Sequence, residues 1–268
     1  MDQFLKTALA LGLILGGLRA PATGQSSNNP IFAGIELGSE GIQAIAIRIA
    51  KTDDAAGARL VSSETIDLSL SLNGSGSSPS QVAEKAAAAV EKLLQQLKQQ
   101  YRVPPEQTYI FGRSGIDARL REALTSAIKK RSEKTVDFLD QATETQLSIV
   151  GIIPKRERVG STTFDNRGSS VLIEVGNYST RGGYEVLRYS PVANYDFVTM
   201  NVPQGTVSFT DEVVKAIGPG SDWTSLAQRA RIIGSDSVRR ALRDEIRNKP
   251  GLLNRKHVYL TGGIVEAL

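Results

Sequence analysis

Two stretches of this sequence share one pattern: an apolar run that ends in a glutamate, one further residue and a glycine. They read IELG at 35–38 and IEVG at 173–176. A second matched pair, YIFG at 109–112 and YLTG at 259–262, follows them in the same order. The first pair is offset by 138 positions and the second by 150. We therefore predict that one structural unit occurs twice, with some twelve extra residues in the second copy.

The spacing of apolar residues predicts mixed α/β structure in both copies. Alternation with period two, as in IQAIAIRI at 42–49, is typical of a strand, and apolar residues every three or four positions are typical of a helix. In the first copy we predict a three-stranded antiparallel meander at 31–37, 42–49 and 60–70, further strands at 108–112 and 136–139, and helices at 80–101, 117–130 and 142–152. In the second copy we predict strands at 170–175, 183–189, 196–202 and 257–261, and helices at 208–217, 223–233 and 235–248.

The two copies define two predicted domains, 31–165 and 168–268. A chain of 268 residues is long enough for two domains of ordinary size. In the first copy 40 residues follow Gly112 up to Ile152, whereas only six follow Gly262. We therefore expect the second domain to lack its last helix, strand and helix, either because the chain is a shortened form or because it continues beyond Leu268.

The N-terminal segment 1–22 has the features of a cleaved signal peptide. Lys6 precedes an apolar run of 12 residues, Thr7 to Leu18, and Ala20-Pro21-Ala22 offers a small-residue cleavage site. The run is too short to span about 30 Å of hydrocarbon, and a buried or interfacial helix is the alternative. We expect a periplasmic or secreted protein with no membrane anchor after cleavage. The absence of cysteine excludes a lipoprotein anchor, disulfides and thiolate chemistry.

Both Glu-x-Gly junctions have the chemistry of an anion site. Glycine allows close approach of the backbone, and successive N–H groups there form a concavity that binds anions. A carboxylate cannot bind phosphate itself, so we expect Glu36 and Glu174 to act through Mg²⁺ or another divalent cation, or through the attacking water.

Other residue types give weaker signals. His257 is the single histidine, so a transition-metal site is not expected, and we predict a structural role for it. The basic run at 129–131 has no interleaved aromatic residues, so we expect no nucleic acid partner. The net charge of +4 is small. We predict that Trp223, the single tryptophan, lies in a core.

Five segments resemble the exopolyphosphatase and guanosine-pentaphosphate phosphohydrolase (Ppx/GppA) family. FAGIELGSEGI at 32–42 is similar to its first phosphate motif, usually IDIGSNSI, and IEVGNYST at 173–180 to its second, DIGGGST. FGRSGIDA at 111–118 lies where the family has T-S-A-x-R-E-A, and VPQGTVSFT at 202–210 resembles L-P-L-G-A-V-x-L-T. Residues 258–267 resemble the glycine pair of the wider actin-like ATPase superfamily. The resemblance implies two ribonuclease H-like (actin-like ATPase) domains with a cleft between them, the second apparently incomplete.

The resemblance also implies the residues of the site. The catalytic glutamate of the family lies in a helix reading E-E-A-R-L-x-x-x-G, and TETQL at 143–147, followed by Gly151, places Glu144 at the second glutamate. Glu144 would orient or deprotonate the attacking water, and Glu36 would be the second catalytic carboxylate. The residues expected to bind phosphate are Gly38, Ser39, Arg113, Gly176, Asn177, Ser179, Thr180 and Arg181, with Glu36 and Glu174 on the metal.

Several substitutions depart from the family pattern. Glu36 and Glu174 stand where the family has aspartate, and Asn177 and Tyr178 replace two glycines. The first hypothesis is a magnesium-dependent hydrolase that removes the terminal phosphate of polyphosphate, and the alternative is an inactive module that binds polyphosphate or another phosphoanhydride. Sugar or acetate kinase chemistry is a weaker option, because Gly262-Gly263 is the sole nucleotide-like motif. A homodimer is left open.

Overall fold

The computed structural model describes residues 29–39, 41–49, 58–70, 72, 77–158, 170–189, 193–218 and 222–262. The predicted signal peptide at 1–22 lies outside these residues, as does Gly263. The chain forms two compact units, which are divided between Gly151 and Ile152.

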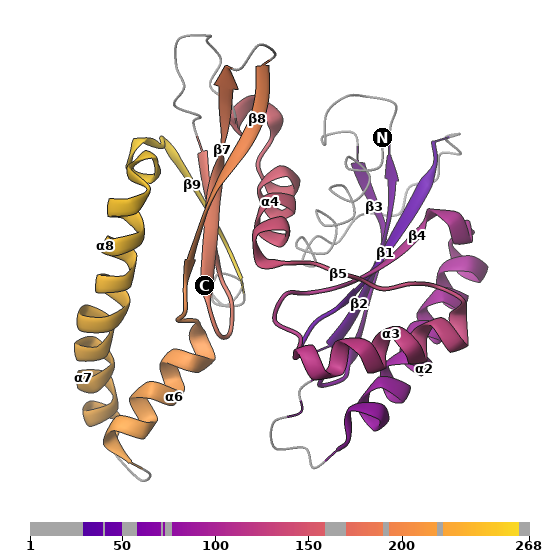
Figure 1. Ribbon diagram of the computed structural model, residues 1–268, viewed down its shortest axis with the longest axis horizontal. Helices are drawn as coiled ribbons and strands as arrows, with labels where there is room; N and C mark the ends of the chain where they lie inside the picture. Colours follow the sequence, from indigo (N-terminus) through magenta and orange to yellow (C-terminus); the bar gives the residue numbers. More distant parts are fainter. Residues whose placement is uncertain are drawn as a thin grey trace. The chain divides into compact units, whose positions relative to one another are not determined.

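The first unit is built on a five-stranded mixed sheet with the order β3-β2-β1-β4-β5 (Figure 1). Its strands are β1 (Ile31–Leu37), β2 (Gly41–Ile49), β3 (Ala58–Asp67), β4 (Thr108–Gly112) and β5 (Asp137–Phe138). The first three pair antiparallel, so the predicted meander is confirmed. β4 lies parallel to β1, and β5 lies parallel to β4.

Polar side chains set the starts of the helices in the first unit. These helices are α2 (Pro79–Gln100), η2 (Pro105–Gln107), α3 (Ala118–Ser132) and α4 (Gln141–Ile152). Ser78 and Gln81 form a reciprocal capping box at the start of α2. The carboxylate of Asp117 accepts from the Arg119 N–H at 2.9 Å at the start of α3, and the hydrogen bonds from Arg119 lower the pKa of Asp117 to about 2.

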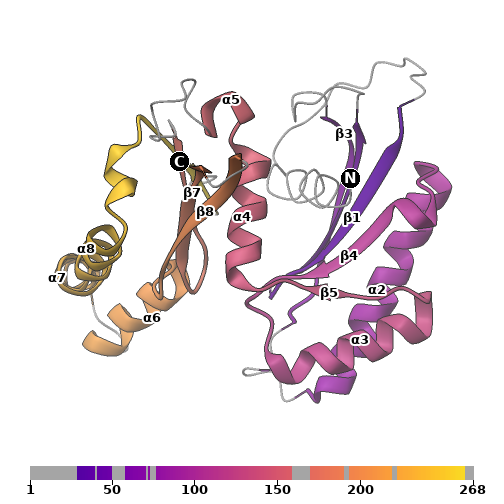
Figure 2. The same cartoon turned by 45° about the horizontal axis from the view of Figure 1, so that its top comes forward.

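The core of the first unit lies between the sheet and the pair α2 and α3. Figures 1 and 2 show these two helices side by side along one face of the sheet. One cluster of fully buried side chains joins β1, β4 and both helices, and includes Ile35, Leu37, Ile110, Val90, Leu93, Leu120, Leu124 and Ile128. In the part of the chain that the structure describes, no helix is both long and apolar enough to cross a membrane.

The second unit repeats the first four strands of the first. Its strands are β6 (Ser170–Val175), β7 (Thr180–Tyr189), β8 (Ala193–Val202) and β9 (His257–Thr261), in the order β8-β7-β6-β9. β6 pairs antiparallel with β7 and parallel with β9, as β1 does with β2 and β4. Glu36 lies opposite Phe111 in the register, and Glu174 lies opposite Thr261. These pairs reproduce the two sequence offsets, so the predicted duplication is confirmed.

The helices of the second unit correct two predictions. They are α5 (Lys155–Arg158), α6 (Thr206–Ile217), α7 (Trp223–Ile233), η3 (Gly234–Val238), α8 (Arg239–Asn248) and η4 (Pro250–Asn254). The predicted break at Gly234 is wrong, because its φ of −61° and ψ of −37° are helical and a π turn connects α7 to α8. The prediction that Trp223 is in a core is also wrong. Its side chain is 81% exposed at the first position of α7, and the buried residue of this helix is Ile233 at the other end.

Two polar contacts join α5 to the second sheet. Tyr259 Oη donates to Glu157 Oε2 at 2.5 Å, and Arg158 Nε lies 3.2 Å from Glu185 Oε2. These contacts explain why the division between the units falls before α5 rather than at residues 165–168, where the sequence analysis placed it.

Glu185 makes the stability of the second unit depend on pH. Burial raises the pKa of this carboxyl above its ordinary value of 4.5, and the charges of Arg158 and Lys155 oppose the rise only in part. A carboxyl whose pKa is raised in the folded state binds protons more tightly there, so its contribution to stability falls as pH increases from about 4.5 through the raised pKa.

Glu185→Gln removes this titration. We expect the free energy of unfolding of the wild type to fall, relative to that of the variant, between about pH 4.5 and about pH 7.5. Urea unfolding at both pH values measures the effect, with the exposed Glu106→Gln as a matched control. Parallel pH profiles for the wild type and Glu185→Gln would contradict it.

Candidate functional site

Both Glu-x-Gly segments form tight hairpins of the same kind. In the first unit the Gly38 N–H donates to the Gly41 carbonyl at 2.9 Å, and in the second the Gly176 N–H donates to the Ser179 carbonyl at 3.0 Å. The Ser39 carbonyl accepts from the Leu70 N–H at 2.9 Å, which fixes the first turn against the segment after β3. The two glutamates therefore occupy equivalent places near the ends of β1 and β6.

Glu144 lies in the first turn of α4, and Asp140 fixes the start of that helix. The Thr143 N–H donates to Asp140 Oδ1 at 2.7 Å and the Thr143 hydroxyl donates to Oδ2 at 2.9 Å, and these bonds lower the pKa of Asp140. The Glu144 N–H donates to the Asp140 carbonyl at 2.9 Å. The helix start thus orients the backbone of the glutamate that the resemblance marks as catalytic.

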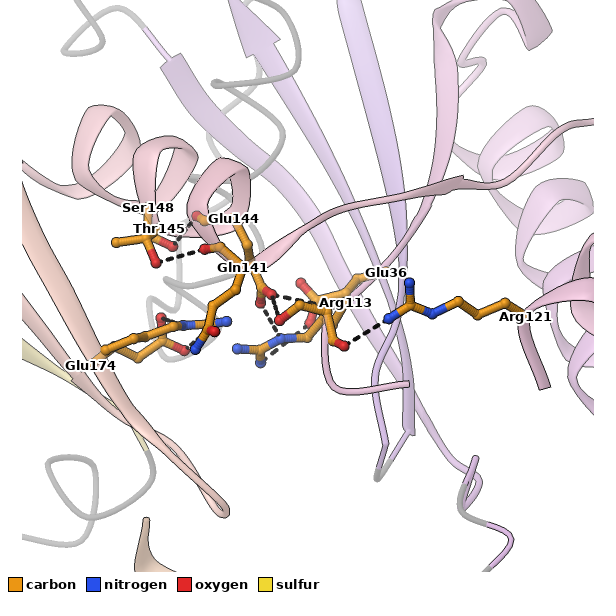
Figure 3. A network of polar contacts seen from close by, with 10 residues as sticks. Glu36, Arg113, Arg121, Gln141, Glu144, Thr145, Ser148 and Glu174 are labelled. Carbon is orange, nitrogen blue, oxygen red and sulfur yellow. Dashed lines mark hydrogen bonds and ion pairs between the residues drawn. The ribbon is translucent and has the colours of Figure 1, made fainter. Parts of the chain in front are cut away.

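Three residues of the first unit lie around this carboxylate, and together with Glu144 we call them the Glu144 cluster: Glu36, Arg113 and Ser114. Figure 3 labels Glu36, Arg113 and Glu144. Arg113 Nε donates to Glu144 Oε1 at 2.7 Å. The Ser114 N–H and hydroxyl donate to Glu144 Oε2 at 3.0 and 2.6 Å. Arg113 Nη1 lies 3.6 Å from Glu36 Oε1. Glu144 is largely buried, at 8% side-chain exposure, whereas Arg113 is 37% exposed.

The loop that supplies Arg113 and Ser114 is held by Arg121 on α3. Arg121 donates to the Ile116 carbonyl at 3.1 Å and to the Ser114 carbonyl at 2.9 Å, and its guanidinium lies 5.5 Å from the centre of the Phe138 ring. When FGRSGIDA is aligned with the family pattern on its final alanine, the arginine of the family falls on Ile116, which is buried. In this chain the arginine that reaches Glu144 is therefore Arg113, three positions earlier.

In the second unit, Glu174 pairs with Arg181. Arg181 Nε donates to Glu174 Oε2 at 3.0 Å and Nη2 donates to Oε1 at 2.7 Å, a bidentate arrangement. The two residues lie directly opposite each other on β6 and β7, and both are buried. Because both oxygens of Glu174 accept from one guanidinium, its negative charge is neutralised within the sheet.

The turn after β6 is bonded to the start of α6. The Gly176 carbonyl accepts from the Thr206 N–H at 2.9 Å, and the Asn177 carbonyl accepts from the Val207 and Ser208 N–H groups at 2.8 and 3.1 Å. The Thr180 hydroxyl donates to the Gln204 carbonyl at 2.8 Å. Asn177 and Thr180, which the sequence analysis assigned to phosphate, thus contribute to this junction, and Ser179 closes the hairpin beside it.

The acidic residues of the first unit fit part of a magnesium site. Glu36 and Glu144 both lie against Arg113, so two carboxylates come close to one guanidinium. Mg²⁺ takes oxygen ligands and is held by one or two carboxylates together with substrate phosphates and waters. No group of three acidic, histidine or cysteine side chains suited to a metal gathers among the described residues. The Glu144 cluster could therefore hold Mg²⁺ only together with a phosphate ligand.

Comparisons with known proteins identify the fold. No protein-family model matches the sequence, and no curated protein matches it. A solved structure of the Aquifex aeolicus member of the Ppx/GppA family has a TM-score of 0.51 at 12% identity, over 77% of this chain and 62% of its own. A second Aquifex aeolicus PPX-GPPA structure has a TM-score of 0.50 at 12% identity, over 78% of this chain and 64% of its own. The chain thus spans less than two thirds of the length of these proteins. It has their mixed α/β, actin-like ATPase fold, as the sequence resemblance implied.

Proposed function

We propose that this chain hydrolyses the terminal phosphoanhydride bond of inorganic polyphosphate. The Glu144 cluster carries the proposal, because it combines a fixed carboxylate, an arginine and an acidic hairpin in one unit. The fold shared with Ppx/GppA structures supports the choice of reaction class. The predicted export signal favours polyphosphate over guanosine pentaphosphate, which is scarce outside the cytoplasm.

Each residue of the cluster has a role that follows from its contacts. Glu144 orients the attacking water or accepts its proton, and the donors on both of its oxygens hold the carboxylate in one orientation. Arg113 neutralises charge next to that carboxylate, and its partly exposed guanidinium is suited to phosphate oxygens. The hairpin that carries Gly38 and Ser39 lies at the end of β1, where we propose that a phosphate approaches; the Gly38 N–H itself is bonded to the Gly41 carbonyl.

Magnesium, where bound, would neutralise charge on the phosphate oxygens and support departure of the leaving phosphate. We propose Glu36 as its protein contact, because this carboxylate lies at the hairpin and its contact with Arg113, at 3.6 Å, is longer than that of Glu144. Glu174 is the poorer ligand, since both of its oxygens accept from Arg181.

The second candidate function is an inactive module that binds polyphosphate. The buried Glu174–Arg181 pair favours it, because a neutralised carboxylate contributes little to holding a cation. The turn after β6 favours it as well, because the Asn177 carbonyl is committed to the start of α6. These features lie in the second unit, whereas the Glu144 cluster lies in the first.

Release of orthophosphate from long-chain polyphosphate tests the proposal. The full chain is incubated with polyphosphate, with and without Mg²⁺, and we expect release only with the metal. Binding without release, seen as a raised melting temperature in polyphosphate, would support the inactive module and contradict hydrolysis. If the chain neither binds polyphosphate nor releases phosphate from it, both candidate functions are contradicted.

A further inference from the structure

The outer face of α8 carries a row of arginines, and we call Arg239, Arg243 and Arg247 the α8 stripe. They are spaced four residues apart, so they lie one above another on the same side of the helix. All three are exposed. No ion pair or side-chain hydrogen bond engages their guanidinium groups within the described ranges, whereas Arg113 and Arg181 are paired with carboxylates.

The side of α8 next to the stripe packs against the rest of the second unit. The helix contacts β8 and η4, and its apolar residues Leu242 and Ile246 are partly buried. Figure 1 shows α8 at the edge of this unit, following α7. The stripe is therefore carried by a helix whose neighbouring apolar side is packed against the unit.

The charges on the rest of α8 do not cancel the stripe. The sequence RRALRDEIRN contains four arginines and two acidic residues. Of the two acidic residues, Glu245 pairs with Lys249. Asp244 is exposed and lies three residues before Arg247, so it borders the stripe at that end and offsets part of its charge there. The stripe itself presents three positive charges in a row of two helical turns.

We infer that the α8 stripe binds inorganic polyphosphate along its chain. Guanidinium groups match phosphate oxygens in geometry and stay charged, and spacing of about 5–6 Å between neighbouring positions suits a ligand that repeats its charge along its length. The choice of polyphosphate rests on the proposed function. A single-stranded nucleic acid would require aromatic side chains for stacking, and α8 has none. A membrane would require apolar side chains on the exposed face, which here is polar.

Binding of long-chain polyphosphate to the full chain in a chelator, where no turnover occurs, tests this inference. The variant Arg239→Gln/Arg243→Gln/Arg247→Gln is expected to bind roughly tenfold more weakly, with a flatter dependence of affinity on salt, because fewer counterions are released. The control Lys98→Gln/Lys129→Gln/Lys130→Gln loses the same charge from exposed positions in the first unit and is expected to bind as the wild type does. Equal melting temperatures verify that both variants are folded.

Three outcomes would overturn the inference: equal losses in both triple variants, no binding by the wild type, or displacement of polyphosphate by single-stranded DNA at equal charge. Hydrolysis of tripolyphosphate, measured for the wild type and for the arginine triple variant, separates this inference from the proposed function. If the protein binds long-chain polyphosphate through the stripe but releases no phosphate, the inference about the stripe is retained and the proposed hydrolysis is contradicted. If the wild type hydrolyses tripolyphosphate and the triple variant binds long chains as the wild type does, hydrolysis is retained and the inference about the stripe is contradicted.

Discussion

Replacement of Glu144 by glutamine is expected to lower the rate of phosphate release from polyphosphate by about 10²–10⁴-fold, the usual contribution of a positioned general base. Glutamine preserves the shape of the side chain but has a single acceptor oxygen. It can accept from Arg113 or from Ser114, but it cannot reproduce the bonds that the two residues make to Glu144 Oε1 and Oε2. Both the base and its orientation are therefore lost.

Steady-state kinetics on polyphosphate measure this effect. The loss should appear in kcat rather than in KM, because the role proposed for Glu144 is toward the attacking water and not toward the phosphate chain. Glu122→Gln, on the exposed face of α3, is the matched control and should leave both constants unchanged. A rate within a factor of two of the wild type for Glu144→Gln would remove Glu144 from the site.

Replacement of Gly205 by alanine is expected to destabilise the second unit by about 3 kcal/mol, at the upper end of the range for overpacking. A Cβ at this position would lie 2.2 Å from the Gly176 carbonyl oxygen and 2.4 Å from the Asn177 carbonyl carbon. Both atoms are backbone, so no side-chain rotation can relieve the contact. The three N–H bonds from α6 to residues 176 and 177 would have to lengthen or break.

Gly234→Ala is the matched control for this glycine effect. Its backbone is helical, and a Cβ would make ordinary contacts of 3.7 and 3.9 Å with the Phe209 ring. We expect it to stabilise the protein by roughly 0.5–1 kcal/mol, because alanine loses less backbone entropy than glycine in a helix. Chemical denaturation measures the free energy of unfolding of both variants. Equal values for Gly205→Ala and Gly234→Ala would contradict close packing between the turn after β6 and the start of α6.

Local patterns in the sequence predicted most of the sheet. The strands 108–112, 170–175 and 257–261 have the bounds that period-two alternation and glycine turns indicate. The duplication followed from two offsets, and the sheet register then reproduced them. The failures are places where tertiary contacts outweigh local signals. A glycine such as Gly234 is typical of a helix end, but here the helix continues through it beside Phe209. A tryptophan is typical of a core, but Trp223 lies exposed at a helix start.

The candidate site was predictable only where the residues belong to a recognisable motif. The sequence resemblance proposes Glu36 and Glu144 as site residues, and the structure shows that both carboxylates lie against Arg113. The Glu174–Arg181 pair could not be foreseen, because it depends on which residues of β6 and β7 lie opposite each other. Ser114 and Arg121 also gave no sequence signal, because their contacts depend on how the loop after β4 folds against α3 and α4.

Hydrolysis in ¹⁸O-labelled water is the most direct test of the central claim, that water attacks the terminal phosphorus of polyphosphate in this protein. Orthophosphate released by the wild-type chain in the presence of Mg²⁺ is analysed by mass spectrometry. We predict one ¹⁸O atom in each released phosphate, and about 10²–10⁴-fold less labelled phosphate from Glu144→Gln over the same time. Release of unlabelled phosphate, or no release from a folded chain that binds polyphosphate, would contradict hydrolysis.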